Sequence, residues 1–545
     1  MQQHYKYNGL LNIYKEAGWT SMDVCARLRS VLHVKKIGHA GTLDPMAEGV
    51  LPVALGRATK SIDSVGEGIK EYRAGMLLGK ETDTEDVTGT VTRTHEGPWP
   101  SEEAVREAVM SFVGGYDQLS PMYSARKVNG KKLYEYARAG IEVERKTRSV
   151  SIYSIEIEEM DLPHVRFRVQ CSQGTYIRSL CRDIGEKLGC GACMESLVRT
   201  QVGSFRIEDA VRISDVQEAE ARQRVDALLR VSAPTAISIG KFDGTHIGHQ
   251  ALFKELRRTA EKHHLRTLVL ILKFGRAGVL SDEDRKQKLY DLGIDYCIEL
   301  EFTEEMKNMS ALDFLEKILI GRFHMKAIVA GKDVSFGRGK AGNAEFLYEH
   351  AEKYGYTVDL IDKVTTGDAE LKSMHGADLD SREISSTMLR ECLKNGEMER
   401  AAELLGAPFS LAGTVVRGKG YATSRMQYPT MNIEVPDDLT LPPFGVYAVR
   451  AEIRGSRIST DVFAVNGIAN LGERPTVNGS IEGGSRLRLE VHAFGEIGDC
   501  YGREVRVAFL KFIRPERKFE DLDALMREIR EHDLPEAEAY FRDNG

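Results

Sequence analysis

Short apolar runs alternate with amphipathic stretches through the middle of the chain. The apolar runs cover residues 236–240, 265–274, 295–300 and 326–331. Between them, apolar residues recur at helical spacing over residues 251–263, 281–293 and 310–323. Strands that alternate with helices are typical of a parallel sheet covered by helices. The pattern therefore predicts an α/β domain with a parallel sheet in this part of the chain.

The pattern changes after residue 406. Short strand-like runs separated by glycine-rich turns cover residues 409–420, 447–455, 461–472, 486–495 and 503–513. Such a series predicts a small antiparallel β-barrel. Residues 519–532 then form a last helix, with an apolar stripe of Leu522, Leu525, Met526 and Ile529. We expect this stripe to pack against the barrel and to have no chemical role.

A proline separates the α/β region from what precedes it. The helical pattern of residues 218–230 stops just before Pro234, and a proline disfavours helix at the preceding residue. The changes of pattern predict three domains, at residues 1–232, 233–406 and 407–545.

The amino-acid composition excludes several classes of protein. Of the 545 residues, 42% are hydrophobic and 29% are charged, which is typical of globular proteins. No apolar run reaches the roughly 20 residues that span a bilayer, and the N-terminus lacks a signal peptide's apolar stretch. We therefore expect a cytoplasmic protein with no membrane partner.

The eight cysteines are scattered along the chain and form no disulfide framework. Cys190 and Cys193 have zinc-like spacing but no second pair, so a turn after a helix explains them better than a metal site.

The charge is unevenly distributed. The net charge is −7, yet residues 1–232 are close to neutral, so the acidic excess lies beyond them. A polyanion such as RNA can still bind the N-terminal domain where basic residues cluster. We expect no DNA partner.

A single aspartate, Asp44, lies in a loop of small residues followed by Pro45. Aspartate before proline commonly starts a turn, so a structural and a catalytic role fit this loop equally well. The surroundings favour catalysis. Tyr72 can stack on a base, the basic tract at residues 126–132 can bind phosphates, and Arg178 can pair with a carboxylate.

These segments resemble bacterial tRNA pseudouridine synthase B. The family carries GHxGTLDPxAxGVL, KxYxA…LGxxTxTxDxxG, PPxYSAxKxxGxxxYexAR and GTYIRxLxxDIG, in that order. The chain has matching segments at residues 38–51, 70–89, 120–138 and 174–185, and the likeness covers residues 8–206. The resemblance implies a mixed-sheet pseudouridine synthase domain that acts on the uridine of the TΨC loop of tRNA.

The resemblance also implies roles for individual residues. Asp44 is the catalytic carboxylate, Tyr72 stacks on the target base, and Arg178 keeps Asp44 ionised. The other uridine-binding positions are His39, Lys127, Tyr176 and Leu197. One carboxylate is enough to release the base from C1′ at N1 and guide its return through C5, so we expect no metal and no cofactor.

The chain departs from this family in three places. The opening KPxGxTSHD motif falls at residues 15–23 without its proline and histidine, and Ser120 replaces the first proline of PPxYSA. The PUA domain that usually follows has no room before Ala236. We expect these changes to weaken tRNA binding rather than to abolish catalysis.

The start of the α/β domain holds two histidines, His246 and His249, in the order His-x-Gly-His. They could bind a metal, contact phosphates at a helix N-terminus, or be ordinary turn residues. The segment GKFDGTHIGHQ resembles GxFDGxHxGHQ of prokaryotic bifunctional riboflavin kinase/FMN adenylyltransferase, also called FAD synthetase. Residues 331–342 and 384–406 resemble two further motifs of that family.

This second resemblance implies a Rossmann-like HIGH-type nucleotidyltransferase that makes FAD from FMN and ATP. The implied ATP and phosphate contacts are Gly240, Asp243, His246, His249, Ser385, Ser386, Thr387 and Arg390. The family's TFxPHP motif would fall at residues 272–278, where its prolines and histidine are missing, and Lys332 replaces a glutamate. In that family the TFxPHP loop contributes to the flavin and nucleotide site, so these changes bear on adenylyl transfer.

The barrel resembles riboflavin kinases. Their GRxLGxPTAN, NxGxRPT and LExHxxx motifs correspond to residues 423–432, 470–476 and 489–495. The resemblance implies that Thr430 and Asn432 hold ATP phosphates and Mg²⁺, with Thr430 as metal ligand, and that Glu490 is the base for riboflavin. Gln427 replaces a glycine of the phosphate loop, where a side chain could impede ATP.

We therefore expect a fusion enzyme with tRNA, riboflavin, FMN and Mg-ATP as substrates. An alternative keeps the synthase but makes residues 236–545 a flavin- or nucleotide-binding module without catalysis. A third reading, a tRNA-binding protein without any activity, would leave Asp44 and Arg178 without a purpose.

Overall fold

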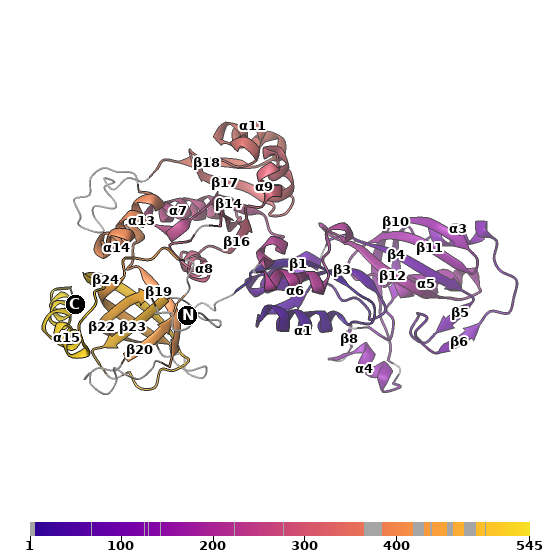
Figure 1. The fold of residues 1–545 in the computed structure, drawn as a ribbon. Helices are drawn as coiled ribbons and strands as arrows, with labels where there is room; N and C mark the ends of the chain where they lie inside the picture. The colour runs from indigo at the N-terminus through magenta and orange to yellow at the C-terminus, as the bar shows by residue number, and fades with distance from the viewer. Residues whose placement is uncertain are drawn as a thin grey trace. The chain divides into compact units, whose positions relative to one another are not determined.

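The computed structural model describes residues 6–544 apart from residues 67, 125, 129, 142, 223, 276, 364–383, 418–429, 436–438, 455–461, 474–486 and 496. The chain divides between Ser232 and Ala233 into two compact units (Figure 1). In its described part, no helix is long and apolar enough to cross a membrane.

The N-terminal unit contains a nine-stranded mixed sheet. Seven strands follow the order β1-β3-β12-β4-β11-β10-β7, while β2 and β13 pair with β3 and β12. The bounds are β1 Gly9–Lys15, β2 Ile37–His39, β3 Glu48–Leu55, β4 Lys70–Leu78, β7 Gly114–Leu119, β10 Thr147–Asp161, β11 His164–Cys171, β12 Ala192–Val202 and β13 Phe205–Arg206. Two small hairpins lie outside it, formed by β5 Lys80–Thr82 with β6 Val91–Thr94 and by β8 Lys127–Val128 with β9 Lys131–Lys132.

Six α-helices accompany this sheet in the part of the unit that the structure describes. They are α1 Ser21–Leu32, α2 Ile62–Gly66, α3 Glu102–Met110, α4 Leu133–Arg138, α5 Ile177–Leu188 and α6 Ile213–Ala221. A core cluster joins α3 and α5 to strands β4, β10, β11 and β12. The helix expected over residues 218–230 is shorter than predicted. α6 ends at Ala221, where the Arg222 N–H bonds back to the carbonyls of Glu218 and Glu220, and a separate 3-10 turn follows at Val225–Leu228.

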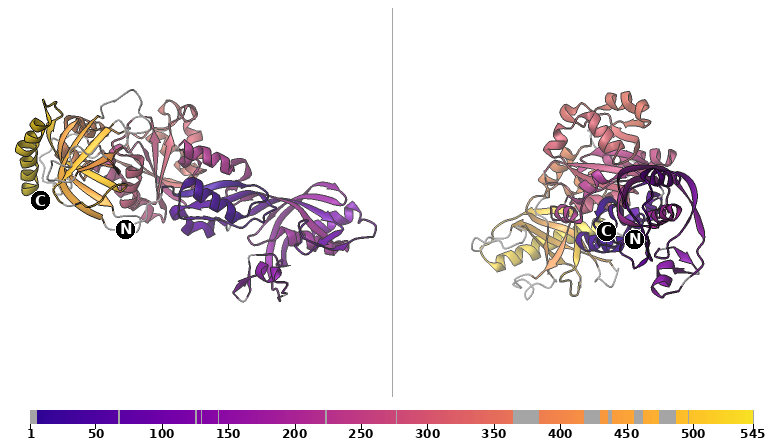
Figure 2. Two further views of the ribbon diagram at one scale, coloured as in Figure 1. Left: turned by 60° about the horizontal axis from the view of Figure 1, so that its bottom comes forward. Right: turned by 90° about the vertical axis from the view of Figure 1, so that its right-hand side faces the viewer.

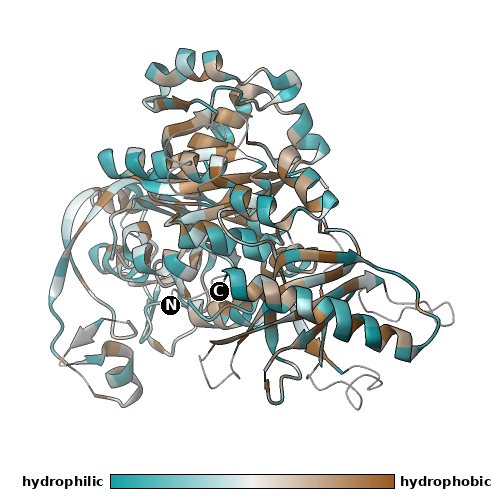
Figure 3. Ribbon diagram, turned by 90° about the vertical axis from the view of Figure 1, so that its left-hand side faces the viewer, coloured by the Kyte–Doolittle hydropathy of each residue, from teal (hydrophilic) through white to brown (hydrophobic). Residues whose placement is uncertain are grey.

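The second unit begins with the predicted parallel sheet. Its strand order is β16-β15-β14-β17-β18, and every neighbouring pair is parallel. The strands are β14 Thr235–Gly240, β15 Arg266–Lys273, β16 Tyr296–Glu301, β17 Met325–Gly331 and β18 Thr357–Ile361. The helices are α7 Ile247–Lys262, α8 Asp282–Asp291, α9 Glu304–Asn308, α10 Ala311–Asp313 with a π-type extension at Phe314–Ile320, and α11 Ala344–Tyr354. In Figure 3 the strands of this sheet are largely hydrophobic (brown) and its helices are more hydrophilic (teal). This contrast is what the alternating pattern of the sequence predicts.

The predicted barrel is present and closed, in the order β19-β20-β23-β22-β21-β24 (Figure 2). Its strands are β19 Ser410–Val416, β20 Thr430–Glu434, β21 Gly445–Arg454, β22 Val462–Glu473, β23 Leu487–Ala493 and β24 Glu504–Pro515. Strand β20 was not among the five predicted runs. It closes the barrel by pairing with β19 and β23.

The C-terminal helix differs from the prediction. It consists of α15 Leu522–Glu528, a wide turn at Ile529–Asp533, and α16 Leu534–Asn544. Ile529 does pack on the barrel, but most of the contact comes from α16, through Leu534, Ala537, Tyr540 and Phe541. Of the predicted stripe, Ile529 takes part in this contact, and the side chain of Leu522 lies outside the described part of the chain.

Two helices connect the parallel sheet to the barrel. α13 Ser386–Asn395 and α14 Met398–Leu405 share one core with the barrel strands, including Leu393, Leu404 and Leu405. Val279, from the loop after β15, belongs to the same core. The division at residue 406 into separate domains remains a prediction.

Candidate active sites

Asp44 lies in the loop between β2 and β3 and faces the first turn of α5. Asp44 Oδ2 is 2.9 Å from Arg178 Nε, and its Oδ1 accepts a hydrogen bond of 3.3 Å from Nη2 of the same guanidinium. Arg178 is buried and also donates to the carbonyls of Thr84 and Tyr123, at 2.9 and 2.8 Å. These bonds fix the cation, while one-third of the Asp44 side chain remains exposed to a substrate.

The ionisation of Asp44 depends on two opposed effects. Burial raises the pKa of this carboxyl group, and the nearby carboxylate of Asp86 adds to the rise. Arg178 and Lys15 act in the opposite direction, because each cation stabilises the carboxylate. Arg178 thus has the geometry and the electrostatic effect that its expected role requires.

Replacing Arg178 with glutamine tests this balance. The change removes the cation that lowers the pKa of Asp44, so the acid limb of pseudouridine formation should move to higher pH, by about one to three units. Single-turnover rates measured across pH would show the shift. The control is Arg166→Gln on β11, which removes an exposed cation that pairs with Glu159. This variant should leave the acid limb at the wild-type pH. An unmoved limb in Arg178→Gln would contradict this role for Arg178.

Three of the other predicted uridine-binding residues lie near Asp44. Tyr72 on β4 and Leu197 on β12 are buried in one core cluster with Leu43, the neighbour of Asp44. Burial raises the pKa of Tyr72 to about 12, so its ring is neutral. Tyr176 precedes α5, and Gln118 holds its backbone through two hydrogen bonds of 2.8 and 3.0 Å.

The last two predicted positions are less completely defined. His39 is on β2, its Nδ1 is buried without a partner, and burial together with Arg199 lowers its pKa. Lys127 lies in the short strand β8, but its side chain is outside the described part of the chain.

Sequence reasoning missed two buried cations that hold the Asp44 loop. Lys15 donates to the carbonyls of Pro45 and Ala47, and Arg199 donates to those of Gly41 and Val50. Both side chains are fully buried. The sequence contains one indication that Arg199 belongs to the site. Arg199 follows Leu197 by two residues, so on a strand the two side chains share one face of the sheet.

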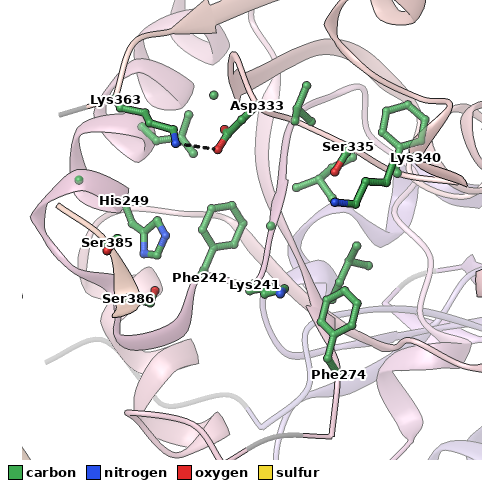
Figure 4. A pocket seen from close by; sticks show the side chains of 18 of the residues that line it. Lys241, Phe242, His249, Phe274, Asp333, Ser335, Lys340, Lys363, Ser385 and Ser386 are labelled. Atoms are coloured by element: carbon green, nitrogen blue, oxygen red, sulfur yellow. Dashed lines mark ion pairs between the residues drawn. The ribbon is translucent and has the colours of Figure 1, made fainter. Parts of the chain in front are cut away.

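The second unit contains a cavity of about 710 Å³ beside the parallel sheet (Figure 4). Its lining includes five of the predicted phosphate contacts, Gly240, His246, His249, Ser385 and Ser386. Helix α7 begins directly after His246, so its free N–H groups lie at the cavity. Ser385 caps the start of α13, which brings a second helix N-terminus to the same cavity.

The two histidines stack on each other, with ring centroids 3.7 Å apart. Burial lowers the pKa of His246 to about 4 and that of His249 well below its ordinary value. Both rings are therefore neutral at physiological pH, and each has a buried Nδ1 without a hydrogen-bond partner. Among the described residues, no cluster of His, Cys, Asp and Glu could hold a metal ion.

The remaining predicted phosphate contacts are arranged differently. Arg390 pairs with Asp243 and donates to the carbonyl of Ala277 at 2.7 Å. Asp243 also accepts from the Val279 N–H at 2.7 Å. Asp243, Thr387 and Arg390 are absent from the cavity lining. Asp243 and Arg390 thus join the loop before α7, the loop after β15 and helix α13.

The residues at the position of the missing TFxPHP motif form part of the cavity wall. Phe274 lines the cavity, stacks on Phe302 at 4.6 Å and has the Lys241 ammonium 4.6 Å from its ring centre. Lys332, expected to add positive charge near the phosphates, instead pairs with Asp362 at 2.6 Å and does not line the cavity.

The predicted kinase residues meet on neighbouring barrel strands. Asn432 on β20 is paired in register with Glu490 on β23, and Thr430 is paired with His492. The Thr430 hydroxyl is 3.1 Å from His492 Nδ1, and Glu490 forms an ion pair with Arg488. Their neighbours Met431, Leu489 and Val491 belong to the barrel core, so the polar set points away from that core, and within it Glu490 and His492 are still buried. Gln427 falls outside the described residues.

Four family models match the chain in succession. They are TruB family pseudouridylate synthase (N terminal domain) at residues 29–177, tRNA pseudouridylate synthase B C-terminal domain at 178–234, FAD synthetase at 229–375, and riboflavin kinase at 405–541. tRNA pseudouridine synthase B of Alkaliphilus oremlandii is 51% identical over 42% of this chain and 75% of its own. The chain belongs to the tRNA pseudouridine synthase B family.

The chain is also similar to a second curated relative and to one solved structure. The tRNA pseudouridine synthase B of Clostridium acetobutylicum is 49% identical over 40% of this chain and 75% of its own. A crystal structure described as a macrolide-efflux protein from Streptococcus pneumoniae is 27% identical over 56% of this chain and 94% of its own, with a TM-score of 0.46. Beyond the synthase segment, the matched families indicate FAD synthetase and riboflavin kinase activities.

Proposed function

We propose that this tRNA pseudouridine synthase B family member isomerises the uridine of the TΨC loop, with Asp44 as the catalytic carboxylate. The observation that supports this most directly is the bidentate pair of Asp44 and Arg178 beside the buried ring of Tyr72. The carboxylate is partly exposed and its cation is fixed, which suits attack on, or stabilisation of, the reacting nucleoside. The base leaves C1′ at N1, turns, and forms the new bond from C5.

Mapping the modified position tests the choice of uridine. An unmodified tRNA transcript treated with the protein should contain pseudouridine in the TΨC loop, detected by carbodiimide modification and primer extension. A transcript with cytidine at that position should give no product. Pseudouridine elsewhere in the transcript would contradict the proposed specificity.

We further propose that the second unit phosphorylates riboflavin at the barrel and adenylylates FMN at the cavity. Glu490, held by Arg488, is suited to accept the proton of the riboflavin 5′-hydroxyl. The neutral rings of His246 and His249 at the start of α7 are suited to contact the phosphates of ATP.

The barrel residues also fit a magnesium ion. Thr430 and Asn432 lie two residues apart on the outer face of β20, and Mg²⁺ prefers oxygen ligands such as hydroxyl and amide groups. Thr430 would be its protein ligand. The ion would neutralise charge on the phosphates of ATP.

Separating FMN from FAD tests the flavin activities. Riboflavin and Mg-ATP incubated with the protein should give both products by chromatography. Neither product would favour the alternative, a flavin- or nucleotide-binding module. FMN without FAD would locate the defect in adenylyl transfer, at the cavity wall where the TFxPHP residues are missing.

A further inference from the structure

Two buried cations lie side by side on the synthase sheet, beyond the groups that contact Asp44. Lys70 precedes Tyr72 by two residues on β4, and Arg199 is paired in register with Tyr72 from β12. Side chains two apart on a strand, and those directly opposite on its neighbour, share one face of a sheet. Lys70 and Arg199 therefore lie on the face that carries the Tyr72 ring.

Their charged ends converge at Gly41, in the loop that carries Asp44. A side-chain carbon at Gly41 would come within 3.3 Å of Lys70 Nζ and 3.4 Å of Arg199 Nη1. Gly41 has a φ of +76°, a conformation that favours glycine, and an added side-chain carbon there would be in tight contact with both cations. Gln173 and Arg148, both exposed, lie nearby: a side-chain carbon at Gly66 would be 3.8 Å from Gln173 Nε2 and 4.0 Å from the Gly41 nitrogen, and Arg148 lies against Gly174.

Among the described residues no carboxylate neutralises these two buried cations, although Arg199 donates to the carbonyls of Gly41 and Val50. Arg199 is 0% exposed and its Nη1 has no hydrogen-bond partner, while Lys70 is 7% exposed. In the part of the chain that the structure describes, neither forms an ion pair with a carboxylate. Burial and the charge of Arg199 lower the pKa of Lys70 to about 8. A buried arginine remains charged and an unpaired buried charge is costly, so the arrangement suits an anion that arrives with the substrate.

We propose that Lys70 and Arg199 form a subsite for a phosphodiester of the RNA next to the target uridine. Tyr72 lies next to both groups, because Arg199 is its register partner on β12 and Leu43, the neighbour of Asp44, belongs to its core cluster. A nucleotide stacked on Tyr72 would reach Asp44 with its sugar and the subsite with its phosphate. The subsite depends on the proposed function in one respect, which is the choice of RNA as its ligand.

Lys70→Met is the informative variant, because methionine keeps the apolar stem of the side chain and removes its charge. Removing an unpaired buried cation should leave the melting temperature unchanged or raise it. Affinity for unmodified tRNA transcript should fall about tenfold, and the slope of log affinity against log salt should decrease by about one contact. Lys187→Met, at the opposite end of α5 from Arg178, removes one exposed charge and should change neither quantity.

A neutral methylphosphonate in place of a single phosphate beside the target uridine tests the contact itself. At the contacted phosphate, the substitution should weaken binding to the wild-type protein about tenfold and have little effect on Lys70→Met. Equal losses for both proteins at every position tested would overturn the proposal. So would Lys70→Met binding tRNA like wild type while melting at a lower temperature, which would make Lys70 a structural residue.

The proposed activity can fail independently of the subsite. If wild type binds tRNA without forming pseudouridine, the affinity and salt measurements on Lys70→Met still apply, and only the catalytic assignment is lost. Inorganic phosphate provides the last comparison. Stabilisation of wild type but not of Lys70→Met by phosphate, with unchanged tRNA affinity in the variant, would show a site for free anions and overturn its assignment to RNA.

Discussion

Asp44→Asn abolishes pseudouridine formation, with an expected loss of at least about 10⁴-fold in the single-turnover rate. Asparagine has nearly the same shape but cannot act as a carboxylate nucleophile or stabilise developing positive charge on the sugar. The Arg178 guanidinium stays in place through its bonds to the carbonyls of Thr84 and Tyr123. Tritium release from 5-³H-uridine in tRNA would measure the rate.

Two controls make this result specific to catalysis. The Asp44→Asn protein should bind tRNA with near wild-type affinity, because the subsite at Lys70 and Arg199 is untouched. Asp209→Asn, which removes an exposed carboxylate paired with Arg230, should retain full activity. Normal turnover by Asp44→Asn would mean that another group performs the chemistry.

Glu490→Gln and His249→Ala should separate the two flavin activities. Loss of the base at Glu490 should slow FMN formation from riboflavin by about 10² to 10⁴-fold. His249→Ala should slow FAD formation from supplied FMN by about 10² to 10³-fold, since a contact to the reacting phosphates is lost. Each variant should keep the activity of the other site, measured by chromatography of both products.

Glu490→Gln and His249→Ala each serve as the control for the other. Because the strands of Glu490 and the cavity of His249 are distinct parts of the second unit, neither change should affect the other reaction. Loss of both activities in either variant, at an unchanged melting temperature, would argue against two separate catalytic sites. Unchanged FMN formation by Glu490→Gln would rule out Glu490 as the base.

The architecture was largely predictable because the strands bury long apolar runs. The run at residues 265–274 gives β15, where six consecutive residues from Thr267 to Leu272 are buried. Strand β20 was missed for the converse reason. It has few inward apolar positions, Met431 and Ile433, and they stand among polar residues that belong to the site.

The sites were predictable in part, through motif residues close together in the sequence. Asp44 and Arg178 are 134 residues apart, and their pairing followed from the resemblance rather than from spacing. Lys15, Lys70 and Arg199 were not identified as site residues because their surroundings depend on strand pairing. Only the fold shows that β1, β4 and β12 bring three buried cations to one loop. The engagement of Arg390 by Asp243 is equally a property of the folded loops.

The core that α13 and α14 share with the barrel has a practical consequence for dissecting this protein. A fragment ending at residue 406 would carry Leu404 and Leu405 without the strands that cover them, and the complementary fragment would expose Phe409. Uncovered apolar surfaces of this kind promote aggregation. Point substitutions in the intact chain are therefore a safer way to assign FMN and FAD synthesis than truncation at the motif boundary.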